Sequence, residues 1–285
     1  MIIGAHVSTA GGLHNSFANA EKIGAQAMQI FGASPRQWKV KMPEEEVLEK
    51  FREARKQTKL GPIFLHASYL VNIGTPDNEL YEKSIQSLIG HLKIAELIEA
   101  EGLIYHIGSY KNSTWEESAK RVVEGMNEAL KNSPGKTHLI MENSAGGGSK
   151  IGLTLEEIGK IYQLAVETLP SEITSRIKVC IDTAHAFGAG ILETFSAEEL
   201  DDFTKEADQA FGLKNLTVLH INDSLVPFNS KRDRHQNIGE GEIGLKSFKN
   251  MSKNKDLNNL PWILEVPGFE KTGPDKRNID LIKAL

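Results

Sequence analysis

The chain has 285 residues, 40% of them hydrophobic and 25% charged, which predicts one globular domain over residues 1–285. No apolar run approaches the roughly 18 residues of a membrane span and no secretion signal opens the chain, so we expect a cytoplasmic protein with no membrane partner. A single cysteine, Cys180, excludes an internal disulfide and is expected to be buried, and the net charge of -5 argues weakly against a nucleic-acid partner.

Short apolar runs alternate with segments of helical period along the chain. The runs are residues 1–7, 25–31, 62–68, 103–109, 138–144, 178–185, 216–223 and 261–267. The helical segments are 45–59, 78–101, 114–132, 154–169 and 196–211. N-cap signals stand at Asp77, Thr114, Thr154 and Ser196, and Thr154 with Glu157 matches a capping box. Eight strand-then-helix units predict an α/β fold, a (β/α)8 TIM barrel; a doubly wound open sheet is the alternative.

Most of the apolar runs have, toward their C-terminal end, a side chain that can bind a metal. The residues at this place in the eight runs are His6, Phe31, His66, His106, Glu142, Asp182, His220 and Glu265. In a TIM barrel they would surround the mouth where active sites are built. Burying so many histidines and carboxylates unpaired is costly, and divalent metal ions would satisfy them. Mixed histidine and carboxylate ligands favour zinc or manganese, and the lack of paired cysteines excludes a thiolate site.

The loop after the seventh run, residues 224–241, adds further ligand candidates. Asp233 and His235 are two positions apart, so both side chains point to one side of an extended segment. With His185 they would form a three-ligand site with open coordination positions, as catalytic zinc sites have. The alternative is a solvated charged loop.

The chain resembles the endonuclease IV family of zinc-dependent apurinic/apyrimidinic endonucleases over its full length. The resemblance rests on "GAHVSTAGG", "HASYLVNIG", "MENSAGGG", "CIDTAHAFGAG", "HINDS", "KRDRHQNIGEGEIG" and "ILEVPG". It implies a xylose-isomerase-like barrel holding three zinc ions, with manganese as a possible substitute. The implied ligand sets are His66, His106 and Glu142 for the first; Glu142, Asp182, His220 and Glu265 for the second; His185, Asp233 and His235 for the third. His6 is left as a nearby polar residue.

Three positions depart from the family pattern without removing a ligand. Gly147 stands where the family usually has glutamine, Ala184 where a cysteine is common, and "HIGSYKN" replaces a more usual His-Pro-Gly-Ser-His. These changes concern contacts to DNA and the rate rather than the presence of the metals.

The resemblance implies a DNA-repair hydrolase that acts on double-stranded DNA with abasic sites or 3′-blocked ends. It would cut the phosphodiester 5′ to an abasic site, leaving a 3′-hydroxyl and a 5′-deoxyribose phosphate, with Glu142 as the catalytic residue that bridges two zincs and orients the attacking hydroxide. The side chains of Arg36, Tyr69 and Leu70 would enter the base stack of the DNA. The resemblance also implies that the protein is a monomer. Basic residues in the mouth-side loops would contact phosphates: Arg36, Lys39, Lys41, Lys111, Lys150, Lys231, Arg232 and Arg234. Bound zinc would offset the negative net charge.

Two other functions fit part of the pattern. A sugar isomerase or epimerase on the same barrel would use Glu142, Asp182, His220 and Glu265 around one manganese, which leaves His66, His106, His185 and the "DRH" loop unused. A non-catalytic, zinc-stabilised binder of damaged DNA is the second, and open coordination positions argue against it. Metal-dependent turnover distinguishes both from the nuclease.

Overall fold

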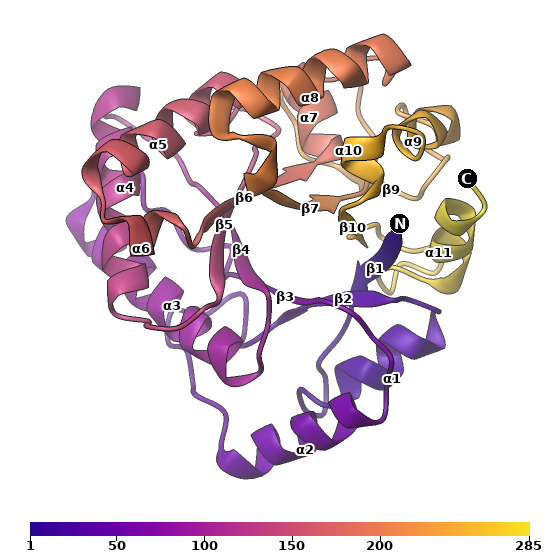
Figure 1. Cartoon of the computed structure of the whole chain (residues 1–285), viewed down its shortest axis with the longest axis horizontal. Coiled ribbons are helices and arrows are strands. Elements are labelled where there is room, and N and C mark those ends of the chain that lie inside the picture. The colour runs from indigo at the N-terminus through magenta and orange to yellow at the C-terminus, as the bar shows by residue number, and fades with distance from the viewer.

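The computed structural model describes all 285 residues, and its centre is a closed barrel of eight parallel strands (Figure 1). The strands are β1 (Ile2–His6), β2 (Ala27–Phe31), β3 (Ile63–His66), β4 (Gly102–His106), β5 (His138–Glu142), β6 (Ile177–Asp182), β7 (Leu216–His220) and β10 (Pro261–Leu264). The first strand pairs with both β2 and β10, which closes the sheet. The predicted TIM barrel is confirmed, and the open sheet is excluded.

Helices surround the barrel on all sides (Figure 1). They are α1 (Asn15–Lys22), α2 (Glu45–Lys56), α3 (Asn78–Leu97), α4 (Trp115–Lys131), α5 (Leu155–Thr168), α6 (Ser171–Thr174), α7 (Thr183–Ala189), α8 (Ala197–Phe211), the 3₁₀ turn η1 (Leu213–Asn215), α9 (Leu245–Met251), α10 (Lys255–Asn258) and α11 (Lys276–Lys283). The five predicted helices are α2, α3, α4, α5 and α8. None of the helices has the length and apolarity needed to span a membrane.

The four predicted N-caps are formed. The side chains of Asp77, Thr114, Thr154 and Ser196 each accept a hydrogen bond from the backbone N–H three residues on. The capping box is only half formed, because Glu157 accepts from the N–H groups of Gly152 and Leu153 and not from that of Thr154. Gly152 has a left-handed φ of 82°, which turns the chain back over the start of α5.

The interior of the barrel is filled by one apolar layer with a polar layer above it. The apolar layer has one residue from each of seven strands: Ala27, Phe64, Ile104, Ile140, Cys180, Val218 and Ile263. On the eighth strand, β1, the residue at this level is Gly4. A Cβ there would lie 2.6 Å from the carbonyl oxygen of Ala27, so the position has no room for a side chain. Since side chains alternate along a strand, the residues two positions further on also point inward. Those residues form the polar layer: His6, Gln29, His66, His106, Glu142, Asp182, His220 and Glu265.

This layer corrects the expectation for one strand. On β2 the inward residue at this level is Gln29 and not Phe31, because neighbouring strands of a barrel are staggered and their ends do not mark one level. Phe31 instead packs with its ring centroid 4.4 Å from that of His6. The expected burial of Cys180 is confirmed.

Candidate metal centre

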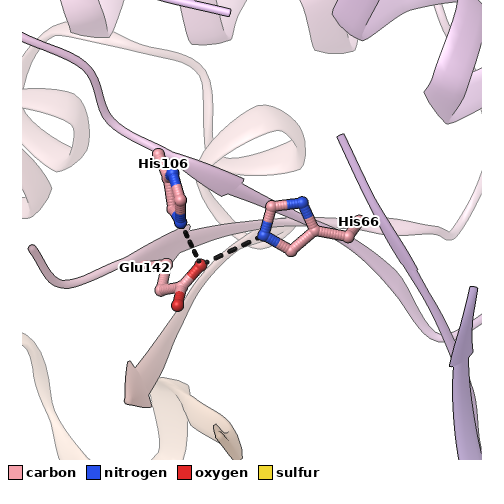
Figure 2. A group of neighbouring side chains, drawn as sticks. All are labelled: His66, His106 and Glu142. Atoms are coloured by element: carbon pink, nitrogen blue, oxygen red, sulfur yellow. Dashed lines mark hydrogen bonds and ion pairs between the residues drawn. The ribbon is translucent and has the colours of Figure 1, made fainter. Parts of the chain in front are cut away.

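Glu142, at the end of β5, is the centre of the polar layer. Its Oε2 lies 3.3 Å from Nε2 of His66 on β3 and 3.2 Å from Nε2 of His106 on β4 (Figure 2). Figure 2 shows the two imidazoles pointing at the same carboxylate oxygen from neighbouring strands. Glu142 and His66 are buried and His106 is partly exposed, so this group opens toward the barrel mouth on one side.

The other oxygen of Glu142 belongs to a second group. Its Oε1 lies 3.0 Å from Nδ1 of His220, and the same nitrogen is 3.4 Å from Oε2 of Glu265 and 3.9 Å from Oδ2 of Asp182. The ligand atoms of Glu142, Asp182, His220 and Glu265 all lie within 4.8 Å of one another. Two ligands of one zinc ion lie at most about 4.4 Å apart, so this group fits a single ion with a small adjustment.

The third group joins α7 to the loop before β9 (His235–Gln236). The Nε2 of His185 lies 3.2 Å from Oδ2 of Asp233, and the Nε2 of His235 lies 3.3 Å from Oδ1 of the same residue. The expected proximity of these three residues is therefore found. Asp182 also reaches this group, with its Oδ2 3.5 Å from Nε2 of His235. The group whose ligand atoms all lie within 4.8 Å of one another is Asp182, His185 and His235, so it differs from the expected set in having Asp182 in place of Asp233. Asp233 contacts each of the two histidines through a different oxygen.

Backbone carbonyls orient three of these histidines. Nδ1 lies 2.8 Å from the Ala67 carbonyl in His66, 3.0 Å from the Asn143 carbonyl in His185 and 3.4 Å from the Glu265 carbonyl in His235. A carbonyl accepts, so Nδ1 carries the proton in the neutral ring and Nε2 keeps its lone pair. In each ring it is this Nε2 that faces a carboxylate of the centre, which is the arrangement found around protein-bound metals.

The charges of the centre oppose the effect of burial. Burial favours the neutral carboxyl of Glu142, but the neighbouring His220 and His106 outweigh it and hold its pKa well below the usual value. Burial also disfavours a charged His185, yet Asp182, Asp233 and Glu142 raise its pKa well above 6.5. Without metal, these pKa shifts favour an ionised Glu142 beside a protonated His185.

Each of the three groups contributes to the lining of a cleft of about 910 Å³, although Glu142, Asp182 and His220 lie beneath its surface. The lining members are His66, His106, His185, Asp233, His235 and Glu265. Tyr69 lines the cleft and is 59% exposed, and partial burial together with carboxylates near it raises its pKa to about 12. The Tyr69 N–H donates to the carbonyl of Pro35, which ties this loop to the one carrying the exposed Arg36. Leu70 is half-buried beside Tyr69. The three residues assigned to DNA thus stand on two connected loops at the rim.

The basic residues have a different distribution from the expected one. The only lysine or arginine that lines the cleft is Lys271, on the loop after β10, which was not among the expected phosphate contacts. Lys150 lines a smaller cavity of about 110 Å³ with His106, His185 and Asp233. The other expected cations do not line either cavity.

Two departures from the family pattern can be placed. Gly147 has a φ of 90°, and a Cβ there would lie 2.8 Å from the carbonyl oxygen of Lys231. A side chain at this position would be strained, so the loop around Gly147 is adapted to glycine. Ala184 is buried in the first turn of α7, and it directly precedes His185 in the sequence.

Three buried polar residues of the site were not predicted from the sequence. Gln29 contacts His6, Glu265 and His220. Asn222 donates to Oδ2 of Asp182 and accepts from the N–H of Glu265. Asp223 accepts from several N–H groups of the loop after β9. The signal for Gln29 was available, since it is the one polar residue inside the apolar run "AMQIF".

The chain is similar to known proteins over its whole length. Residues 17–285 match a family described as xylose isomerase-like TIM barrels. A "Probable endonuclease 4" of Halothermothrix orenii is 38% identical over 100% of this chain and 99% of its own. Endonuclease IV of Thermus thermophilus has a solved structure with a TM-score of 0.84 and 32% identity, covering 100% of this chain and 98% of that one. A 3-keto-D-glucoside 4-epimerase from E. coli has a TM-score of 0.70 at 14% identity, which shows the shared fold alone.

Proposed function

The chain belongs to the endonuclease IV family, and on this premise we propose that it hydrolyses the phosphodiester 5′ to an abasic site in double-stranded DNA using three zinc ions. Membership makes it a metal-dependent DNA-repair nuclease. The products would be a 3′-hydroxyl and a 5′-deoxyribose phosphate, and blocked 3′ ends would be further substrates. The observation that carries the proposal is the presence of three metal-binding groups around one cleft, two of them sharing Glu142.

The residues present fit three zinc ions. The Nε2 of His235 is buried without a hydrogen bond although two carboxylates lie within 3.5 Å, which is the environment of a ligand atom. Every group mixes imidazole nitrogen with carboxylate oxygen, a donor set that zinc accepts. We assign His66, His106 and Glu142 to the first ion; Glu142, Asp182, His220 and Glu265 to the second; His185, Asp233 and His235 to the third. When bound, the ions would activate water near neutral pH and neutralise charge on the phosphate.

The chain's own groups would bind and orient the DNA. Glu142 would hold the first two groups together through its two oxygens. Lys271 would contact a backbone phosphate on one wall, and the hydroxyls of Ser8, Thr9 and Ser34 line the cleft with it. A chain of net charge -5 thus presents a cation where the strand would lie.

Selection of the abasic site would depend on the rim loops. We assign Arg36, Tyr69 and Leu70 to the base stack, where their insertion would let the abasic nucleotide move toward the metals. A nucleotide without a base has lost its pairing and stacking, so moving it out of the helix costs less than at an intact pair. The exposed Tyr69 ring lies 5.8 Å from that of His66, so a base stacked on Tyr69 would lie directly above the first group.

A sugar isomerase or epimerase is the second candidate. The four residues Glu142, Asp182, His220 and Glu265 do form one compact group, which is what such an enzyme requires. It would leave the contacts of His66 and His106 with Glu142, and the whole third group, without a use. We therefore rank it below the nuclease.

Metal analysis combined with an incision assay tests the proposal. Purified protein is assayed for bound metals and for cutting of a duplex with one abasic site, before and after chelation. We expect nearly three zinc ions per chain and incision 5′ to the lesion that chelation abolishes and zinc restores. One metal per chain with no incision and turnover of a ketose or aldose would overturn it in favour of the isomerase.

A further inference from the structure

We propose that Gln29 is the positioning residue that fixes two ligands of the second metal group at once. Gln29 is fully buried on β2 and lies inside the barrel beside the polar layer's histidines and carboxylates. It is not one of the assigned ligands, since its amide oxygen faces His220 and its amide nitrogen faces Glu265 and His6. The inference rests on the assignment of Glu142, Asp182, His220 and Glu265 to one zinc ion.

The amide oxygen of Gln29 determines which nitrogen of His220 is free. Nε2 of His220 lies 2.7 Å from Oε1 of Gln29. A carbonyl oxygen only accepts, so Nε2 of His220 keeps its proton, and Nδ1 is the nitrogen that would give up its proton to a metal ion. This Nδ1 is the atom that faces Glu142 and Glu265. In the other ring form, His220 would present N–H to the site and bind no metal there.

The amide nitrogen of Gln29 binds one of the two carboxylate oxygens of Glu265 and leaves the other one available. Nε2 of Gln29 donates to Oε1 of Glu265 at 2.5 Å and lies 2.9 Å from Nδ1 of His6. Oε1 is therefore occupied, and Oε2, which lies 3.4 Å from Nδ1 of His220, is left for the metal. The amide cannot flip, because its oxygen would then face the carboxylate of Glu265 and its NH₂ would face the N–H of His220.

His6 completes the arrangement from the cleft side. Its Nδ1 accepts one hydrogen of the Gln29 amide, so both hydrogens of this NH₂ group are used. The ring of His6 is held between Gln29 and Phe31. The buried amide thus has all of its hydrogen-bonding groups satisfied, and its orientation is fixed from three sides.

Zinc affinity measured by competition with a chelator tests the inference without DNA. Gln29→Met keeps the volume and removes the hydrogen bonds to His220, Glu265 and His6. Gln29→Glu keeps the acceptor for His220 but puts a second carboxylate against Glu265. We expect each variant to bind one of its zinc ions about 10-fold to 100-fold more weakly, the range found for lost outer contacts of metal ligands. The control is Gln163→Met on the outer face of α5, which should match the wild type.

The outcomes separate this inference from the proposed function. Three zinc ions bound as tightly in both variants as in the wild type would overturn the role of Gln29 and leave the nuclease intact. A wild type that binds a single metal and does not cut DNA would overturn both. If the variants fail to fold, ¹⁵N spectra of the wild-type histidines decide, because a zinc-loaded His220 protonated at Nδ1 contradicts the proposed role and one protonated at Nε2 supports it.

Discussion

The Nε2 of His185 lies 3.2 Å from Oδ2 of Asp233, and this contact joins the first turn of α7 to the long loop after β7. Asp233 is half exposed, whereas His185 is buried, so the loop closes over the third group from the solvent side. Asp233 is also 3.3 Å from His235, which makes it the carboxylate shared by both histidines.

Asp233→Ala is expected to remove the third zinc and leave the other two. The first two groups share Glu142 and do not include Asp233. Loss of one ion that neutralises phosphate charge is worth several kcal/mol, so kcat should fall roughly 100-fold or more. Metal analysis and incision kinetics measure both effects. Asp256→Ala on the exposed α10 is the control, and three bound zincs in Asp233→Ala would contradict the assignment.

Glu142→Gln should remove most of the activity through both of the first two groups. Each Glu142 oxygen lies within 3.3 Å of two imidazole nitrogens, and an amide presents one oxygen and one NH₂ in their place. We expect at least one zinc to be lost and incision of abasic duplex to fall by roughly 100-fold or more. If Glu142→Gln cut abasic duplex as fast as the wild type does, and neither protein distinguished abasic from intact duplex, the measured cutting would not come from this centre.

Asp223→Asn should lower the affinity for the third zinc ion, although Asp223 is not itself an assigned ligand. The buried Asp223 carboxylate accepts from the N–H groups of Ser224, Gly239, Gly241, Ile243 and Gly244, and so holds the loop that follows His235. Replacing one oxygen by NH₂ leaves buried donors unpaired, at about 1–3 kcal/mol of stability. Thermal melting and metal analysis measure the change. Thr114→Ala, which removes the N-cap of α4, is the control, because it should lower stability without lowering zinc content.

The strand ends were predictable because parallel strands of one barrel all finish at one rim. Looking for a histidine or carboxylate toward the C-terminal end of each apolar run therefore found His66, His106, Glu142 and Asp182 without a structure. Gln29 was missed because the stagger between β1, β2 and β3 is a property of the closed barrel and is invisible in one strand.

The start of α7 was missed for a different reason. The run "KVCIDTAH" contains no glycine or proline that would mark a boundary, and the change from strand to helix within it occurs at Asp182, whose side chain caps the helix by accepting from the N–H of His185. The predicted strand over 178–185 was therefore too long, since β6 ends at Asp182. The tautomers of the histidines could not be predicted from the sequence either, because they depend on hydrogen bonds to carbonyl groups of other segments.

Tyr69→Ala should weaken recognition of the abasic site and leave the metals in place. Tyr69 makes no contact through its hydroxyl that holds the loop, since the loop is tied by the backbone N–H and by Ser68. Stacking of a base on an aromatic ring is worth about 1–3 kcal/mol, so KM for abasic duplex should rise roughly 10-fold. Fluorescence of 2-aminopurine next to the lesion reports the opened stack. Tyr162→Ala on α5 is the control; an unchanged KM and fluorescence in Tyr69→Ala would remove Tyr69 from the DNA interface.

The pH dependence of stability should differ between metal-free and zinc-loaded protein. Burial lowers the pKa of His185, but Asp182, Asp233 and Glu142 outweigh it, and its pKa is raised in the folded state. A raised pKa stabilises the fold at pH below the ordinary histidine value near 6.5, and this stability is lost as the pH rises through the folded-state pKa. For Glu142, whose pKa is depressed, the sign is opposite, and its stabilisation is lost only in acid.

Zinc replaces the proton of His185, so its binding becomes tighter as that proton becomes easier to remove. The melting temperature of the chelated protein should therefore fall as the pH rises above the ordinary histidine value near 6.5 and through the raised pKa of His185. The melting temperature of the zinc-loaded protein should stay constant, so the difference between the two should widen. His185→Gln removes one titrating group and should reduce the widening. A gap that narrows toward alkaline pH in the wild type would mean that the histidines of the centre are neutral without metal, contrary to the ion pairs seen around Asp233 and Glu142.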